Sequence, residues 1–315
     1  MPSLEELARI PVITVSKRPE PAWKTAAALS VVTAEDIRRS GARSLGAVLR
    51  LAPGLSVAQV TARDWMVGAR GFDQQFANKL LVLLDGRSIY TTWFGGVFWD
   101  EHTLLLEDLA QVEVVRGPGA AVWGANAVNG VINLVTKPAA ETQGVLLTAT
   151  TGTTETSGAV RYGATLAGGW AYRVHALAFR HGATRTATGA DAGDEWSGGR
   201  AGFRIDRAGE NLARLTLSGE AYQSRGDFVR EGVRFAPPDF TFLDRDSGVR
   251  LSGGHVLARW DAQDQRGLGL AVQASADTSW RLQSAFELEQ QAYELSFQHA
   301  GERGPHLWSW GAGVR

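Results

Sequence analysis

The sequence predicts an α+β domain followed by antiparallel strands of the kind that build a transmembrane β-barrel. Through residue 140, short apolar runs, helix signals and glycine turns alternate, as in a compact mixed domain. From Gly144 onward, polar and apolar residues alternate with a period of two over segments of about ten residues, which is the pattern of membrane-spanning strands. The 37 glycines and 11 tryptophans agree with many turns and an interfacial aromatic belt.

Local signals predict each element of the first domain. Thr33 is a candidate N-cap, with Asp36 three residues later as a loose capping box. A second helix has apolar residues at helical spacing and stops at Pro53-Gly54. A continuous apolar run indicates a strand buried on both faces. In chain order, the elements so predicted are a helix from Thr33, a helix at Ser44–Leu51, a strand at Leu80–Leu84, a turn at Asp85-Gly86, a short helix at Leu104–Leu109 and a strand at Gln111–Val115.

The glycine-rich stretch Gln111–Lys137 (QVEVVRGPGAAVWGANAVNGVINLVTK) is the most informative segment. A dinucleotide fingerprint is excluded, because Gly124 comes two positions too late after Gly117-Pro118-Gly119. A P-loop is excluded as well, because Ala125 and Asn126 stand where Lys and Ser/Thr are required. The residues after the loop, Val128–Val135, read as a strand rather than a helix. These glycines therefore indicate tight turns inside a packed domain, not a phosphate site.

The second region contains about nine predicted strands, joined alternately by short and long connections. A soluble sandwich would show similar alternation, but short turns on one side and long loops on the other favour an outer-membrane arrangement. The short connections are Ala167-Gly168-Gly169, Asp206–Asn211 and Asp261–Gly267, and the long ones are Gly182–Glu195 and Ser224–Ser252. The alternating sets are Val160–Leu166, Trp170–Ala178, Ala213–Ala221, Val256–Trp260 and Leu268–Ala274.

Composition excludes several classes of protein. The chain has no cysteine, and its net charge of −1 gives no general nucleic-acid footprint. There is no apolar run of about 18 residues, so no transmembrane helix is predicted. Met1–Ser16 lacks the basic and apolar regions of a signal peptide. If the protein is exported, we therefore expect the numbering to begin at or near the start of the mature chain. The six histidines show no metal-ligand spacing and no G-x-S-x-G elbow occurs, so no catalytic residue, metal or cofactor is predicted.

Five segments in order resemble the plug domain of TonB-dependent outer-membrane receptors. They cover roughly residues 10–140, and the glycine-rich segment VEVVRGPGAAVWGANAVNGVINLVTK resembles the family's most specific signature. The resemblance divides the chain into an N-terminal periplasmic segment (1–24), a plug (25–140) and the first part of a transmembrane barrel (141–315). The other four segments are PVITVSKR (Pro11–Arg18), SVVTAEDIRRSGARSLGAVLRLAPGLSV (Ser30–Val57), VGARGFD (Val67–Asp73) and KLLVLLDGRSIY (Lys79–Tyr90).

The resemblance also implies a barrel larger than this chain. Transporters with a plugged lumen have about 22 strands, so about nine strands make a partial barrel, and an open edge is not viable in lipid. We therefore expect a fragment or a truncated gene product. The alternative, a complete small barrel around a plug, is physically poor, because an eight-stranded barrel is filled by its own side chains.

The family implies energy-coupled import across a bacterial outer membrane rather than enzymatic activity. A scarce ligand, most simply a ferric siderophore, binds at the plug, and the energised inner-membrane protein TonB engages an N-terminal TonB box. Cobalamin, haem and glycan receptors share the same plug signatures. A passive outer-membrane protein such as an adhesin or porin, and a soluble β-rich binding protein, are the alternatives from other classes. The residues that match the box are Val12, Ile13, Thr14, Val15 and Ser16, a β-prone segment that could add as an edge strand to a partner sheet or could be a frayed terminus.

Further site residues follow from the same resemblance. The segment IYTTWFGGVFWD places Tyr90, Trp93 and Phe94 at a plug apex, where aromatic rings can stack on a ligand, while Phe98 and Trp99 are expected in packing. Gln74 and Gln75 are candidates for polar contacts at a second apex. Arg70 and Arg116 match arginines that pair with barrel glutamates, which we expect beyond Arg315; the alternative is that each arginine only caps a local turn.

Overall fold

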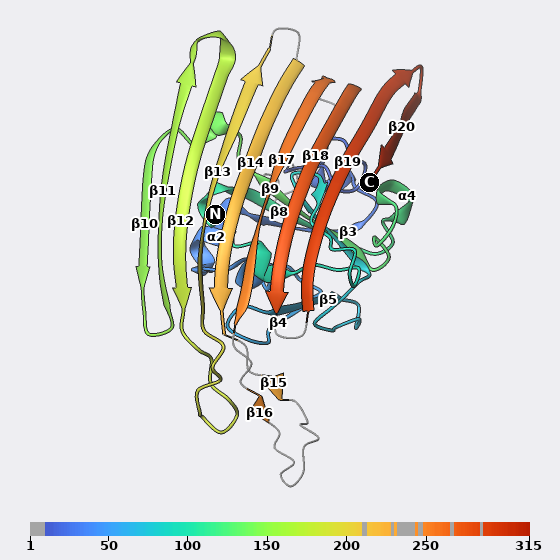
Figure 1. Cartoon of the computed structure of the whole chain (residues 1–315). Helices are drawn as coiled ribbons and strands as arrows, with labels where there is room; N and C mark the ends of the chain where they lie inside the picture. Colours follow the sequence, from blue (N-terminus) through green and yellow to red (C-terminus); the bar gives the residue numbers. More distant parts are fainter. Residues whose placement is uncertain are drawn as a thin grey trace.

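The computed structural model describes residues 10–209, 213–227, 230–231, 243–244, 248–264, 268–283 and 286–315. The chain forms an N-terminal α+β domain, up to residue 143, and a broad antiparallel sheet from Gly144 onward. Figure 1 shows the domain lying against one face of the sheet, with the long strands passing in front of it. The predicted fold class is confirmed: a mixed domain followed by nine paired antiparallel strands.

The domain is built around a five-stranded sheet in the order β3-β8-β9-β6-β7. Strand β6, which lies between β9 and the short edge strand β7, is buried at all five positions, as the continuous apolar run predicts. β6 pairs with β9 in parallel, and the other pairs are antiparallel. Asp85 and Gly86 make the turn after β6 with positive φ angles of 51° and 82°. The five strands are β3 (Ala28–Thr33), β6 (Leu80–Leu84), β7 (Arg87–Ser88), β8 (Leu109–Arg116) and β9 (Gly130–Thr136).

The helices of the domain are short and lie where capping residues start them. Thr33 caps α2 (Ala34–Ser40) in a complete capping box with Asp36, and Gly41 ends it in the left-handed conformation. Ser44 caps α3 (Leu45–Leu49). The short helix predicted before β8 is a 3₁₀ turn, η3 (Leu106–Asp108). The remaining helical segments are α4 (Ala120–Trp123), η1 (Ala22–Lys24), η2 (Trp99–Glu101), η4 (Ala139–Glu141) and, between barrel strands, η5 (Ala167–Gly169).

An apolar core joins the sheet, both N-terminal helices and a separate hairpin, β4 (Leu55–Gln59) with β5 (Trp65–Ala69). Val48, Leu49, Val112, Ile132 and Leu134 are fully buried in it. In the glycine-rich segment, Gly130 has to be glycine, because a Cβ there would lie 2.5 Å from the carbonyl oxygen of Val115 on the paired strand. The glycines thus permit the close packing of β8, α4 and β9.

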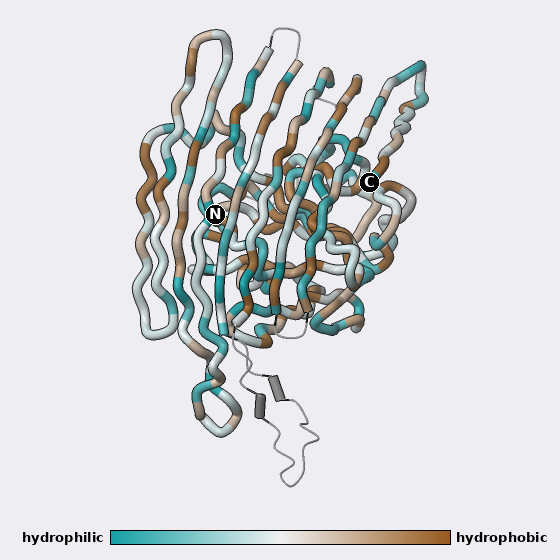
Figure 2. Tube along the Cα trace, viewed as in Figure 1, coloured by the Kyte–Doolittle hydropathy of each residue, from teal (hydrophilic) through white to brown (hydrophobic). Residues whose placement is uncertain are grey.

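The second sheet has nine strands in the order β10-β11-β12-β13-β14-β17-β18-β19-β20. On its outer face, large apolar side chains such as Val145, Leu147, Tyr162, Val256 and Tyr293 are exposed, as barrel strands require. Figure 2 shows hydrophobic and hydrophilic residues alternating along these strands. The strands are β10 (Gly144–Thr151), β11 (Glu155–Leu166), β12 (Trp170–His181), β13 (Trp196–Ala208), β14 (Ala213–Gly226), β17 (Val249–Gln263), β18 (Gly269–Gln283), β19 (Phe286–Arg303) and β20 (His306–Val314).

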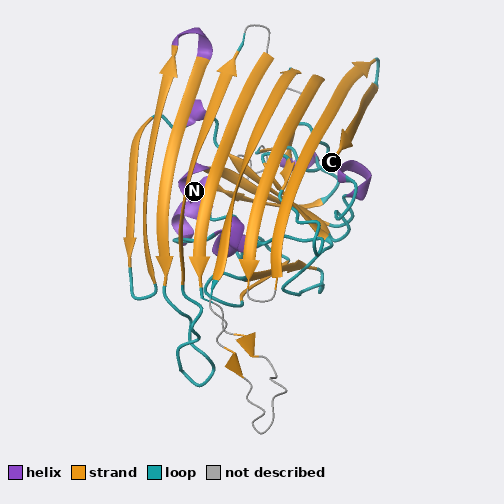
Figure 3. Ribbon diagram, in the orientation of Figure 1, coloured by secondary structure: helices purple, strands orange, loops and turns teal. Residues whose placement is uncertain are grey.

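The two ends of the strands differ in their connections. Residues 182–195 join β12 to β13 at one end of the sheet, at the bottom of Figure 3, and β14 ends and β17 begins at the same end. The small hairpin of β15 (Arg230–Glu231) and β16 (Leu243–Asp244) lies between β14 and β17 in the chain. Tight turns such as η5 lie at the opposite end. We call these the loop end and the turn end. Within the described residues, every helix is too short or too polar to cross a bilayer.

Candidate functional site

The N-terminal segment folds back onto the domain instead of extending from it. Only Pro11–Val12 forms a strand (β1), which pairs with β2 (Glu20–Pro21). The chain then turns, with the Lys17 amide donating to the Ile13 carbonyl and Lys17 at a φ of 57°. Val12 and Thr14 are 0% and 1% exposed. The predicted box, residues 12–16, is therefore docked, and only its first residue has extended pairing.

Glu113, in the middle of β8, holds this turn. One carboxylate oxygen, Oε2, accepts hydrogen bonds from the Ile13 amide (3.0 Å), the Thr14 amide (2.8 Å) and the Thr14 hydroxyl. Gln111 Nε2 donates to the other oxygen (2.7 Å) and also to the carbonyl of Pro11 (2.9 Å). Glu113 is 0% exposed, so these bonds are what compensates the burial of its carboxylate.

Trp123 on α4 holds the same turn from the other side. Its indole N–H donates to the carbonyl oxygen of Thr14 at 2.6 Å, and the Lys17 ammonium lies 4.5 Å from its ring centroid. Together, Glu113 and Trp123 occupy both amides of Ile13 and Thr14 and the Thr14 carbonyl. We call these two residues the clasp. The clasp occupies the main-chain groups that a pairing strand from a partner would need.

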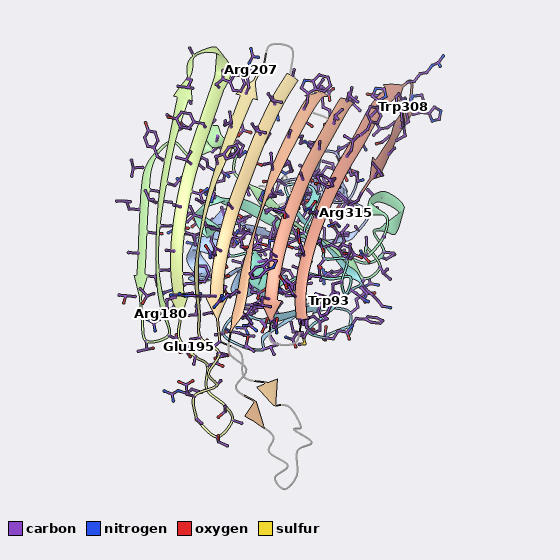
Figure 4. All side chains as sticks on the ribbon, viewed as in Figure 1. Trp93, Arg180, Glu195, Arg207, Trp308 and Arg315 are labelled. Carbon is purple, nitrogen blue, oxygen red and sulfur yellow. The ribbon has the colours of Figure 1, made fainter. Side chains whose placement is uncertain are left out.

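The aromatic apex lies at the loop end, where Figure 4 places Trp93. Trp93 is 51% exposed, and its other face packs against Phe286 at the start of β19, with 4.5 Å between the ring centroids. Phe94 packs edge-on against Phe98, which is buried, and against Phe76. The expected packing role of Phe98 agrees with its burial. The apex therefore offers one broad, exposed aromatic face, held by the rings beneath it.

The remaining predicted ligand residues surround this apex at different depths. Tyr90 is half-buried, its carbonyl accepts from Arg315, and the Arg315 guanidinium lies 5.0 Å from its ring centroid. Gln74 and Gln75 are exposed in the loop after β5, in the same loop as Phe76. Thr91 and Thr92 are hydrogen-bonded to Gln290 of β19, which fixes the apex to the barrel wall.

Arg70 and Arg116 are brought together by the fold. Arg70 is exposed with a φ of 59°, and its guanidinium donates to the carbonyl of Arg116 at 3.3 Å. The Arg116 side chain lies against Gly54, where a Cβ would come within 2.7 Å of it. No ion pair involves either arginine among the described residues, so their pairing with barrel glutamates stays a prediction.

Most ion pairs that attach the domain to the sheet have the opposite polarity: carboxylates of the domain meet arginines of the strands, and the Arg87–Asp277 pair has the reverse arrangement. Arg281 of β18 is 2% exposed and binds Asp100 through two hydrogen bonds, at 2.5 and 3.1 Å, and Glu101 through two more, at 3.0 and 3.2 Å. The same guanidinium lies 3.9 Å from the centroid of Phe98, directly below the apex. Asp100 and Glu101 therefore couple the apex to the wall.

A second group of contacts lies nearer the turn end. Asp108 pairs with Arg161 and with Arg173, the latter at 3.1 Å. Arg204 lies 3.5 Å from Asp85 in the β6–β7 turn and donates to Thr136. Arginine suits this role, because its planar donors bind carboxylates in a fixed geometry and remain charged.

At the loop end, the domain is anchored through main-chain groups. The amide of Ala62 donates to Asp194 at 2.8 Å, and its carbonyl accepts from the Trp196 indole at 3.0 Å. Asp194 lies in the connection between β12 and β13, and Trp196 is the first residue of β13. The loop between β4 and β5 is thereby tied to the wall at a buried site.

Electrostatics at the interface are set by burial. Burial lowers the pKa of His102, next to Glu101, well below 6.5, and the neighbouring charges of Arg87 and Arg200 lower it further. This imidazole is therefore neutral at physiological pH. Among the described residues, no cluster of His, Cys, Asp or Glu could hold a metal ion.

The sequence reasoning did not find the clasp or the Arg281 site. Glu113 and Thr14 are 99 positions apart, and Arg281 and Asp100 are 181 apart. The only local signal for the clasp was a charged residue, Glu113, inside the apolar run of β8. For the Arg281 site, the signal was an Asp-Glu pair directly after the aromatic apex, and both residues are buried.

Comparison with known proteins agrees with this architecture. Residues 21–131 match the family model described as TonB-dependent Receptor Plug Domain. Among curated proteins, vitamin B12 transporters of the BtuB type are similar. The one from Vibrio vulnificus is 31% identical over 135 residues, which is 42% of this chain and 21% of the transporter, and one from Vibrio cholerae is 30% identical over 140 residues. The chain thus matches about a fifth of the length of these relatives.

Solved structures share the fold over nearly the whole chain. The pyoverdine receptor FpvA from Pseudomonas aeruginosa bound to pyoverdine has a TM-score of 0.68 at 15% identity and covers 96% of this chain and 48% of its own. The alcaligin receptor FauA from Bordetella pertussis has a TM-score of 0.66 at 16% identity, and the match covers 96% of this chain and 49% of FauA. At this level of identity, the likeness concerns the fold of the domain and of its barrel strands.

Proposed function

We propose that this chain, a member of the TonB-dependent receptor family that comprises the plug domain and part of the barrel, imports a scarce ligand across a bacterial outer membrane. The observation that carries the proposal is the plug itself, which lies against the inner face of the barrel strands with an aromatic apex at the loop end. A passive pore or an adhesin has no use for such an obstruction. The loop end then faces the outside, and the turn end faces the periplasm.

The partner on the periplasmic side is TonB, and its binding segment is the docked box, residues 12–16. The clasp withholds the main-chain groups of Ile13 and Thr14. TonB therefore has to compete with the clasp, and a ligand that loosens the plug promotes pairing with TonB. Deleting residues 12–16 is expected to abolish uptake while leaving surface binding of the ligand intact. Uptake at the wild-type rate after this deletion would exclude energy coupling through the box.

We infer that the ligand is a ferric siderophore and that it contacts Trp93, Tyr90 and Phe94. The broad exposed ring of Trp93 suits a rigid metal chelate, and the structural neighbours include receptors for alcaligin and for pyoverdine. Cobalamin is the second candidate, because the similar curated proteins are vitamin B12 transporters. Gln74 and Gln75 lie in the same loop as Phe76, which packs on Phe94, and complete the proposed surface with polar groups.

Binding of ferric siderophores and of cobalamin to outer membranes that contain the receptor tests the ligand class directly. Trp93→Ala is expected to weaken binding, since ring stacking at this position supplies about 0.5–1.5 kcal/mol beyond area burial. Trp23→Ala is the matched control, because Trp23 is also exposed but lies in η1, beside the N-terminal segment. Equal affinities for wild type and Trp93→Ala would remove the apex from the binding site.

A further inference from the structure

Two cavities lie between the plug and the barrel wall, one nearer each end of the strands. The cavity towards the loop end has a volume of about 40 Å³ and is lined by polar groups that include Tyr90, His102, Ser279 and Gln290. The cavity towards the turn end has a volume of about 60 Å³, and its lining combines the polar Asp85, Arg173, Arg204 and Ser218 with apolar side chains that include Leu84, Leu105, Leu109 and Leu257. Each has room for ordered water.

Three residues, Arg87, Glu220 and His255, line both cavities, so the two cavities meet at this point. Strand register explains the meeting point. Glu220 of β14 lies directly opposite His255 of β17, which in turn lies opposite Asp277 of β18. Directly paired residues share one face of a sheet, so this row faces the plug. Arg87, the first residue of β7, reaches the row and pairs with Asp277.

Buried polar atoms along this contact lack protein partners. Arg87 is 3% exposed, and its Nε has no hydrogen-bond partner among the described residues. The same holds for Nδ1 of His175 and Nε of Arg200, which flank the row. Buried polar groups are nearly always satisfied, and the adjoining cavities are large enough for the water that satisfies them. This contact is therefore a wet seam, polar where the two cavities meet and partly apolar towards the turn end.

We propose that the imported ligand crosses the barrel along this seam, between β7 of the plug and strands β14, β17 and β18, and that the Arg87–Asp277 pair is the contact that opens. The inference rests on the proposed import function. Passage through the middle of the plug would expose its apolar core, including Val82, Ile132 and Leu134. Leu84 and Leu109 are core residues that line the turn-end cavity. Parting the seam leaves the other three core residues buried and breaks polar contacts around Arg87 that water and the ligand can replace.

The lining also defines the chemistry of the ligand that passes. Guanidinium, carboxylate, imidazole and hydroxyl groups line the seam, with both signs of charge present, beside leucines in the turn-end cavity. A ligand rich in hydrogen-bond donors and acceptors satisfies these groups as it moves, whereas an apolar ligand leaves them unpaired. The charged groups where the cavities meet therefore select a ligand that carries hydrogen-bonding groups.

Single cysteines test the route, because this chain contains no cysteine of its own. Ser279→Cys and Ser218→Cys place a thiol in each of the two cavities. Each variant is produced as the receptor in its own outer membrane and is modified with either a small methylthio group or a bulky maleimide. Surface binding and energy-dependent uptake of the ligand are then measured. The bulky group is expected to remove most of the uptake at both positions while surface binding persists, and the methylthio group is expected to leave uptake intact.

Two matched controls complete the experiment. Ala276→Cys lies on the outer face of β18, and Ser157→Cys lies on the inner face of β11, outside both cavities. Neither is expected to block uptake when modified. Unhindered uptake by bulky-labelled Ser279→Cys and Ser218→Cys overturns the seam route, and a block only at Ser157→Cys places the route elsewhere. An absence of uptake in the unmodified wild-type receptor refutes the proposed function instead, so the two failures are distinct.

Discussion

Replacing Glu113 by glutamine is expected to release the N-terminal segment without removing any volume. The carboxylate oxygen Oε2 accepts two amides and one hydroxyl of Ile13 and Thr14. Glutamine is isosteric, but it offers a neutral oxygen and points a donor group where an acceptor is needed. The Trp123 contact to Thr14 remains, so the segment is loosened rather than lost.

The size of the effect follows from the hydrogen bonds. A hydrogen bond to a charged group contributes about 1.5 kcal/mol at the low end of its range, so three contribute about 4.5 kcal/mol. Neutral hydrogen bonds are about half as strong, so the substitution costs about 2 kcal/mol of docking free energy. This shifts the ratio of released to docked segment by about 30-fold.

Limited trypsin digestion measures this ratio. When closing is fast relative to cleavage, the cleavage rate follows the population of the open form. Lys17 is held over the Trp123 ring when the segment is docked, and Arg18 is protected by the following Pro19, so cleavage after Lys17 reports release. Glu107→Gln is the control, because this carboxylate lies exposed in η3. Equal cleavage rates for Glu113→Gln and the wild type would refute the reasoning, since the clasp would then contribute nothing to docking.

Two more predictions concern the interface between plug and barrel. Arg281→Met removes the guanidinium that binds Asp100 and Glu101 and leaves these buried carboxylates with longer contacts, to Arg63 at 3.7 Å and to the Tyr222 hydroxyl at 3.3 Å. We therefore expect it to destabilise the receptor by about 3 kcal/mol, the low end of the range for a broken buried pair. Thermal unfolding in detergent measures the loss, and Arg303→Met on the exposed end of β19 is expected to have no effect. His102 has a folded-state pKa well below its unfolded value of 6.5, so its contribution to stability is complete above pH 6.5 and is lost as the pH falls towards the folded-state pKa. His102→Gln should therefore reduce the drop in melting temperature between about pH 7.5 and about pH 5.5, and an unchanged drop would contradict this assignment.

Local signals predicted most of the fold correctly. The capping box at Thr33, the Ser44 cap and the doubly buried strand β6 were each read from a few adjacent residues, and each is present. The alternating segments predicted about nine barrel strands, and nine are paired. Such features depend on side-chain period and backbone preference, which act over one element at a time.

The docked state of the N-terminal segment lay beyond this reasoning. A β-prone run at Val12–Val15 indicates an edge strand, but a buried carboxylate on β8 turns it back after Val12. Tertiary contacts override weak local preference when a buried charge gains several hydrogen bonds at once. The same cause buries Asp100 and Glu101, which look like surface residues beside an exposed aromatic loop.

The sequence by itself determined the elements of this protein, the order of plug and barrel, and the residue types at the aromatic apex. Only the tertiary structure decided which charges meet, because Glu113 with Thr14, Arg281 with Asp100 and Arg87 with Asp277 are each joined across 99 or more positions. Pairing over such separations depends on strand register and on the seating of the plug against the wall. No periodicity within one segment encodes that placement.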